Sequence, residues 1–215
     1  MSLILAGKTA SGIVVASDRR LTGEKNEGET TFKFVTTDNE QKSFLVNHRF
    51  SISYCGNVNI KGLPTSAHIQ RSIELMKNCY TTFSVAEALN QYWHEKSINN
   101  RPSIIISGYN SDGPSIIEIK PDCDAPVIHH KNNDTYGFVY HGETDIVKSL
   151  LNSGEIQYSL MSPQDMVELF ELLIVTTAKL QKIQRRQQTV SEKYDLLLLS
   201  PTAAKWIISP SSNIF

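Results

Sequence analysis

Cysteine and histidine side chains are the first candidates for chemistry in this sequence, because both can bind metals and both can react. The three cysteines, Cys55, Cys79 and Cys123, are odd in number and far apart, and no CxxC or Cys/His spacing typical of zinc occurs. None of the six histidines belongs to an HExxH motif, and His129 and His130 would point to opposite faces of a strand. We therefore expect no metal and no cofactor, and reduced cysteines in a cytoplasmic protein.

Composition and charge argue against several kinds of partner. The 215 residues are 40% hydrophobic and 20% charged, with a net charge of −1, so we expect neither nucleic acid nor a membrane as a partner. The basic residues of the cluster at 179–186 end an amphipathic segment, where cations interact favourably with the helix dipole and with solvent. No apolar run reaches the roughly 18 residues of a membrane span, and the first apolar stretch is too short for a secretory signal. The length suits a single domain over residues 1–215.

Runs rich in apolar and β-branched residues, bounded by turn residues, predict strands in three parts of the chain. The charged, glycine-containing segment Glu24–Glu29 is expected to be a loop. The predicted strands cover residues 2–7, 13–17, 32–37, 43–47, 50–55, 103–108, 115–119, 136–140, 195–199 and 205–208.

Helical spacing appears twice between these groups of strands. The first pair of helices is expected within 65–78 and after a capping box formed by Ser84 and Glu87. The second pair is expected over 144–152 and from Ser162 to about residue 186. Strands, two helices, strands, two helices and strands suit two sheets that bury one face against each other and carry helix pairs outside. The predicted fold is therefore α+β, a four-layer αββα sandwich.

Three short motifs add to this order of elements. Gly12–Thr22 reads as a small residue, an apolar run, an acid, two arginines and a threonine; Phe50–Gly56 is a strand that ends in glycine; His141–Asp145 contains Gly-Glu-Thr. With the element order, these motifs resemble the β subunits of proteasomes, which are N-terminal-nucleophile (Ntn) hydrolases. The third motif resembles the bacterial ancestral β-subunit branch called Anbu more than ordinary proteasomes.

The resemblance assigns the attacking residue to Ser2, counting back from Asp18. A serine hydroxyl is a poor nucleophile unless a base lies next to it. In this class the base is the free α-amino group of the same residue, whose reference pKa of about 7.7–8.0 suits neutral pH. Because an amide nitrogen cannot serve, Met1 must be removed, and serine is small enough to permit this. The alternative is that Ser2 is only the usual small residue after an initiator.

The resemblance also implies supporting residues. Asp18 would hold a cation that lowers the pKa of the serine hydroxyl, and Lys42, at the start of a strand, is favoured over Lys33 for that cation. A backbone N–H near Gly56 would stabilise the oxyanion, since glycine lets the backbone approach the substrate closely. The plainer alternatives are that Asp18 caps a turn or pairs with a neighbouring arginine, and that Lys42 is an ordinary solvated lysine.

The late part of the chain departs from the family pattern. Active members carry an Asp-x-x-Ser element that hydrogen-bonds the N-terminal amine. Here Thr189 or Ser191 can supply the hydroxyl, and Asp195 matches the aspartate of the following strand, but no aspartate occupies the position of the first acid. Gly142 falls where proteasomes have a serine, and its plainer interpretation is a turn residue. The network that positions the amine is therefore thinner than in proteasomes.

Three functional hypotheses follow from the resemblance. The first is an N-terminal serine peptidase in a homo-oligomeric ring, which cleaves peptides or unfolded proteins through an ester on Ser2. The second is a catalytically inactive structural or binding subunit, and the third is a small-molecule amidase that works outside a closed ring. The partners implied are further copies of the chain. A regulatory ATPase is compatible with the resemblance but cannot be inferred from the sequence.

Overall fold

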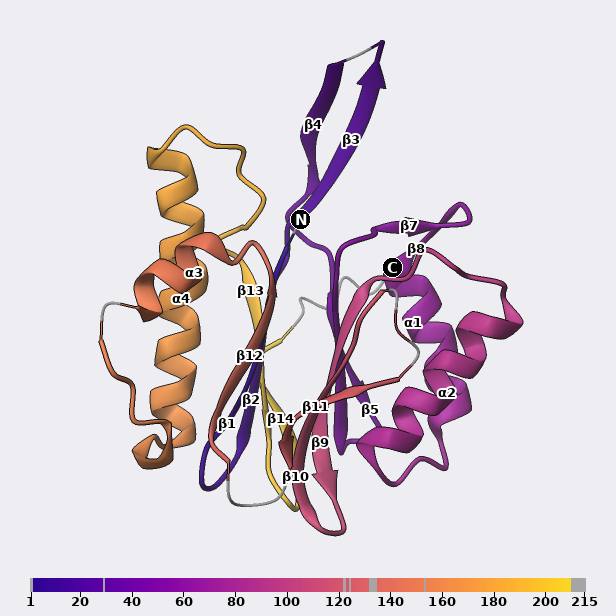
Figure 1. Ribbon diagram of the computed structural model, residues 1–215, viewed down its shortest axis with the longest axis vertical. Helices are drawn as coiled ribbons and strands as arrows, with labels where there is room; N and C mark the ends of the chain where they lie inside the picture. Colours follow the sequence, from indigo (N-terminus) through magenta and orange to yellow (C-terminus); the bar gives the residue numbers. More distant parts are fainter. Residues whose placement is uncertain are drawn as a thin grey trace.

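Two five-stranded antiparallel sheets form the centre of the molecule (Figure 1). The computed structural model describes residues 2–28, 30–121, 123, 125–131, 135–152 and 154–209. The first sheet has the order β12-β1-β2-β13-β14, and the second has the order β11-β10-β9-β6-β5. The first consists of β1 (Leu3–Lys8), β2 (Ile13–Asp18), β12 (Gly137–Gly142), β13 (Tyr194–Leu199) and β14 (Ala204–Ile208). The second consists of β5 (Ser43–Val46), β6 (Phe50–Cys55), β9 (Ser103–Asn110), β10 (Gly113–Ile119) and β11 (Val127–Lys131).

Helices cover the outer face of each sheet (Figure 1). Beside the first sheet lie α3 (Asp145–Leu151), the 3₁₀ helix η2 (Tyr158–Leu160) and α4 (Pro163–Ile183). Beside the second sheet lie α1 (Thr65–Ile73), the 3₁₀ helix η1 (Glu74–Met76) and α2 (Thr82–Glu95). The prediction of a mixed α and β class is confirmed.

Strand β1 shows why its sequence is apolar at every position rather than at alternate ones. Leu3 and Leu5 pack in the core that α4 covers, whereas Ile4 and Ala6 pack in a second core between the two sheets. Side chains alternate between the two faces of a strand, so a strand buried on both faces needs apolar residues at both. The start of β1 is therefore held in the interior of the protein, and Ser2 precedes it directly.

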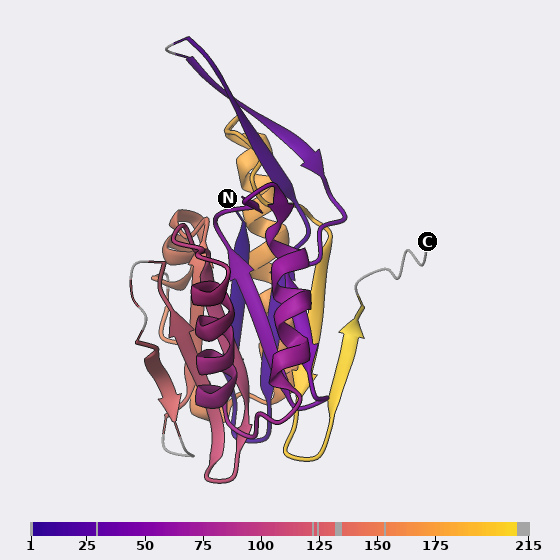
Figure 2. The same ribbon diagram turned by 90° about the vertical axis from the view of Figure 1, so that its right-hand side faces the viewer.

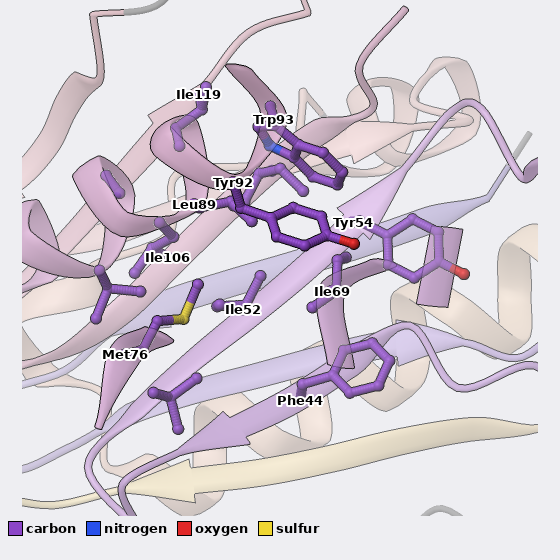
Figure 3. Close-up of a cluster of buried hydrophobic side chains, with 14 of the residues drawn as sticks. Phe44, Ile52, Tyr54, Ile69, Met76, Leu89, Tyr92, Trp93, Ile106 and Ile119 are labelled. Atoms are coloured by element: carbon purple, nitrogen blue, oxygen red, sulfur yellow. The ribbon is translucent and has the colours of Figure 1, made fainter. Parts of the chain in front are cut away.

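The third core lies between the second sheet and its helices (Figure 3). Tyr92 and Trp93 of α2 meet at a ring-centroid distance of 5.5 Å in an edge-to-face arrangement, and Ile52 and Ile106 of the sheet pack beside them. Each fully buried side chain of this size contributes roughly 1.5–3 kcal/mol to stability. This core fixes β6, whose end carries Gly56, against α1 and α2.

A two-stranded arm projects from the body (Figure 2). It consists of β3 (Leu21–Glu27) and β4 (Thr30–Thr37), and a smaller pair of strands, β7 (Asn59–Ile60) and β8 (Leu63–Pro64), follows β6. The prediction of a loop over Glu24–Glu29 is therefore wrong, although Glu29 lies outside the described residues. The polar composition of β3 gave no strand signal, because the strand pairs with β4 instead of burying a face in the core.

Two helix boundaries differ from the predictions. Helix α2 begins three residues earlier than expected, since the Thr81 hydroxyl accepts the Ser84 N–H at 3.0 Å and the Ser84 hydroxyl accepts the Thr81 N–H at 3.1 Å. Ser84 is thus the third residue of a capping box and not its first. The first helix ends as 3₁₀ turns at Met76, whose carbonyl accepts the side-chain N–H of Asn47 at 2.7 Å.

Two further helix features concern the second pair. The capping box at Ser162 and Asp165 is confirmed, and α4 ends at Ile183, a few residues before the expected end.

Within the described part of the chain, no helix has the length and apolar character that crossing a membrane requires.

Candidate active site

The hairpin of β1 and β2 brings the start of the chain to Asp18. Ile4 pairs with Ser17 across the two strands, and the backbone N–H of Leu3 donates to Oδ1 of Asp18 at 2.8 Å. Asp18 is fully buried and Ser2 is 2% exposed. The structure therefore places Ser2 and Asp18, 16 positions apart in sequence, side by side at one end of the first sheet.

Asp18 is held by four donors. Besides Leu3, the ammonium group of Lys42 donates to Oδ1 at 2.8 Å, and the backbone N–H groups of Arg20 and Ser191 donate to Oδ2 at 2.8 and 3.3 Å. A buried carboxylate needs such partners, because leaving a charge without them in the interior costs several kcal/mol. These bonds fix the carboxylate in one orientation between Lys42 and the start of β1.

Lys42 is a buried cation, so the alternative of a solvated lysine is wrong. Its side chain is 1% exposed, and Nζ donates to the Arg20 carbonyl at 2.6 Å as well as to Asp18. The rival residue Lys33 lies in β4 of the arm, where its backbone pairs with Glu24. Of the two lysines, Lys42 is therefore the one whose ammonium group contacts Asp18.

The two neighbouring arginines have other acidic partners. The Arg20 guanidinium forms a bidentate pair with Asp38 at 2.6 and 2.8 Å, which holds the pKa of Asp38 below its usual value. The Arg19 guanidinium pairs with Asp195, whose pKa burial raises in spite of this partner. Asp195 therefore belongs to an ion pair with Arg19, and among the described residues no hydrogen bond joins it to Ser2.

The carbonyl of Ser2 is held by the end of β12. The backbone N–H of Glu143 donates to it at 2.8 Å. Gly142 has a φ of +103°, and a Cβ at this position would lie 1.6 Å from the Ser2 oxygen. Only glycine permits this approach, so Gly142 is more than a turn residue. Ser2 is consequently positioned by two strands, β2 on one side and β12 on the other.

A buried polar network connects β12 to the loop after α4. The Glu143 carboxylate, on a residue only 7% exposed, accepts the Thr189 hydroxyl at 3.1 Å and an N–H of Arg186 at 3.3 Å. The Gln181 amide donates to the Thr189 hydroxyl at 2.8 Å and accepts the Thr189 N–H at 2.9 Å. Glu143 and Gln181 had no predicted role; the only sequence signal for Glu143 was its place in the His141–Asp145 motif.

Ser191 lies beside Asp18, and its backbone N–H donates to Oδ2 of Asp18. Its hydroxyl donates to the Lys193 carbonyl at 2.6 Å and accepts the backbone N–H of Arg19 at 3.3 Å. The two predicted hydroxyl residues therefore have different neighbours: Thr189 faces Glu143, and Ser191 supports Asp18 and the turn that follows β2.

A pocket of about 360 Å³ opens beside Gly56. Its walls come from the base of the arm, Thr22–Glu24, and from the segment Gly56–Asn59 after β6. Gly56 has a φ of +107°, which strongly favours glycine. The predicted oxyanion residue thus lines a surface pocket that is large enough for a side chain of a peptide.

Cys55 is a further candidate nucleophile, near Lys42 and Asp18. It is buried, and burial raises its pKa to about 12, a shift that the positive charge of Lys42 only partly opposes. A thiol with that pKa stays protonated at neutral pH and is a poor nucleophile. Cys55 is therefore a poor candidate for a nucleophile. In the part of the chain that the structure describes, no group of three or more His, Cys, Asp or Glu side chains is arranged to hold a metal ion.

Comparison with protein-family models and with curated protein sequences finds no match to this chain. The function is therefore argued from the geometry of the site.

Proposed function

We propose that this chain is an Ntn hydrolase of the proteasome-like type, with the αββα sandwich of that class and with Ser2 as its nucleophile. The observation that carries the proposal is the buried contact of Asp18 with both Lys42 and the backbone N–H of Leu3, each at 2.8 Å. A buried ion pair at the start of a fully buried strand is a costly arrangement for stability alone. It is the arrangement that an N-terminal nucleophile needs.

In the proposed mechanism, removal of Met1, which lies outside the described residues, gives Ser2 a free amine. The amine takes the proton of the Ser2 hydroxyl while the oxygen attacks a peptide carbonyl. The positive charge of Lys42 favours the ionised oxygen, and Asp18 holds Lys42 in place. The Gly56 N–H stabilises the developing oxyanion. The protonated amine then gives its proton to the leaving amine, and water hydrolyses the remaining ester on Ser2.

The Glu143 network supports the proposal in the region where the sequence departs from the family. The carboxylate of Glu143 holds the Thr189 hydroxyl, and the N–H of the same residue holds the Ser2 carbonyl. We propose that Glu143 takes over part of the positioning that the absent aspartate provides elsewhere. Peptides or unfolded proteins are the proposed substrates. A ring of identical subunits is the proposed assembly, and the cytoplasm is the proposed location.

The decisive experiment combines intact mass with a β-lactone probe that acylates N-terminal nucleophiles. We expect protein purified from cells to lack Met1 and to gain one probe per chain on the Ser2 residue. The matched variant Ser2→Ala should also lose Met1 but take up no probe and cleave no fluorogenic peptide. If the protein retains Met1 and is not labelled, the hydrolase proposal fails.

The second candidate is an inactive subunit of the same architecture. It is favoured by one observation: Asp195, which matches the late aspartate of the resemblance, pairs with Arg19, and among the described residues no hydrogen bond joins it to Ser2. Retention of Met1 together with a ring-sized particle in light scattering would support this candidate. A labelled protein with the size of a monomer would instead favour the small-molecule amidase.

A further inference from the structure

The arm is inserted in the chain between the two charged residues of the candidate site. Strand β3 begins at Leu21, shortly after Asp18, and β4 ends at Thr37, shortly before Lys42. The arm stands away from the body (Figure 2), and two strands alone hold a hairpin only weakly in water. The base of the arm must therefore be fixed if Asp18 and Lys42 are to keep their places.

Arg20, the residue before β3, contacts both members of the buried pair through its backbone. Its N–H donates to Oδ2 of Asp18 at 2.8 Å, and its carbonyl accepts an N–H of the Lys42 ammonium at 2.6 Å. The position of this one residue therefore decides where the ammonium group lies relative to the carboxylate. Such geometry matters for chemistry, since a displacement of about 1 Å can cost on the order of a hundredfold in rate.

The side chain of Arg20 closes the base of the arm. Its guanidinium reaches Asp38, the first residue after β4, and forms a bidentate pair with it at 2.6 and 2.8 Å. The two side chains are 12% and 32% exposed, so the pair is partly shielded from water. A bidentate arginine–carboxylate pair fixes the geometry of its partners as well as neutralising their charge. The chain is thus held together where it enters and leaves the arm.

Further hydrogen bonds attach the base of the arm to the body. The Arg20 guanidinium donates to the backbone carbonyl and the side-chain oxygen of Gln188, in the loop after α4, at 3.3 and 3.2 Å. The backbone N–H of Glu40 donates to the Arg19 carbonyl at 3.0 Å. The segment between β4 and β5 therefore lies against the turn that follows β2, and Lys42 lies at the end of that segment.

We propose that Arg20 and Asp38 are positioning residues whose ion pair holds the Lys42 ammonium in its place. Neither side chain touches the reacting atoms in the mechanism above, and both act through the backbone of residue 20. The placement of Lys42 is argued from these contacts alone. Its effect on catalysis rests on the proposed function, because it requires that Lys42 act on the Ser2 hydroxyl.

The test measures how fast the N-hydroxysuccinimide ester of acetic acid acetylates the Lys42 amine in the folded, full-length protein, as read by peptide mass spectrometry. In the wild type the reaction should be slow, because the Lys42 side chain is only 1% exposed. Arg20→Gln and Asp38→Asn each remove the ion pair and leave the backbone groups of residue 20 in place. We expect Lys42 to react several-fold faster in both variants, because its carbonyl acceptor is no longer fixed.

Two controls separate positioning from a general loss of stability. Lys8 is also 1% exposed, but it lies at the opposite end of β1 from Ser2, so its amine should react slowly in every variant. Glu74→Gln breaks an exposed ion pair with Lys77 and should leave the rate at Lys42 unchanged.

The double variant Arg20→Gln/Asp38→Asn should react at Lys42 no faster than the faster single variant, since both changes remove the same contact. Unchanged rates at Lys42, equal acceleration at Lys8 and Lys42, or multiplied factors in the double variant would each overturn the proposal. These measurements need no turnover, so they remain valid if the hydrolase proposal fails. If the protein cleaves peptides, Asp38→Asn should lower kcat several-fold and leave KM nearly unchanged; the opposite pattern would contradict a positioning role.

Discussion

The carbonyl oxygen of Ser2 occupies the space that a side chain on residue 142 would need. A Cβ at Gly142 would lie 1.6 Å from that oxygen and 2.6 Å from the Ser2 carbonyl carbon, both of which are backbone atoms. Backbone that is held by strand pairing cannot move aside as a flexible side chain can. The end of β12 and the residue before β1 are therefore fitted to each other.

We expect Gly142→Ala to displace Ser2 and to destabilise the protein. Left-handed strain costs roughly 1–2 kcal/mol and overpacking a further 1–3 kcal/mol or so. Gly62→Ala is the matched control, because Gly62 also has positive φ, at +80°, but has open space around it. It should lose only the strain energy. Urea unfolding of both variants measures the difference, and equal losses would show that the contact with Ser2 carries no cost.

Removing the cation from the Asp18 pair should be strongly destabilising. Lys42→Met retains the length of the side chain but leaves a fully buried carboxylate without its charged partner, which costs about 3–5 kcal/mol. The double variant Asp18→Asn/Lys42→Met should lose less than the sum of the two single variants, since it removes both charges. Additive losses in urea unfolding would contradict a direct interaction.

A surface pair provides the comparison for that experiment. Lys77 pairs with Glu74 on η1, and both side chains are about 70% exposed. Lys77→Met should leave the free energy of unfolding close to that of the wild type, because exposed ion pairs contribute little. A similar loss in both lysine variants would mean that the effect comes from the substitution itself and not from burial of the pair.

The sequence predicted those features of the structure that depend on a few neighbouring residues. Asp18 lies in a short motif at the end of a strand, and Lys42 directly precedes a strand. The structure brings the two side chains together as the resemblance implied. The apolar run of β1, the capping box at Ser162 and the mixed α and β class were likewise readable, because apolar pattern and cap chemistry act over a few residues.

The parts that sequence missed depend on contacts between distant segments. Glu143 and Gln181 acquire partners only when the loop after α4 folds against β12, and the contact of His129 with Glu118 depends on a β-bulge that composition does not reveal. Strand β3 of the arm was missed for the opposite reason: it pairs with β4 outside the core, so its sequence lacks the apolar alternation that marks a buried strand.

The hydroxyl of Thr189 should matter more than its methyl group. Thr189→Val removes the donor to the buried Glu143 carboxylate and the acceptor of the Gln181 amide. Hydrogen bonds to charged groups contribute about 1.5–3 kcal/mol, so we expect a loss in that range in urea unfolding. Thr189→Ser retains the hydroxyl and should lose clearly less. If the serine and valine variants are equally destabilised, the hydrogen bond to Glu143 contributes nothing to the free energy of unfolding.

Cys55 and Cys123 should differ sharply in reactivity, because only the thiolate is nucleophilic. Burial raises the pKa of Cys55 to about 12, whereas Cys123 is exposed. In folded protein at pH 8, iodoacetamide should label Cys123 and leave Cys55 unmodified; after unfolding in urea it should label both, as peptide mass spectrometry can show.

The same pKa shift has a consequence for stability at high pH. The unfolded state loses the Cys55 proton near the ordinary cysteine value of about 8.5, while the folded state keeps it to about pH 12. The resulting stabilisation is present below pH 8.5 and is lost as the pH rises above it. Cys55→Ala should therefore lose less stability than the wild type between pH 8 and pH 10. A steeper loss in the variant, or labelling of Cys55 in the folded protein, would show that the thiol ionises in the site and would reopen the question of which side chain there is the nucleophile.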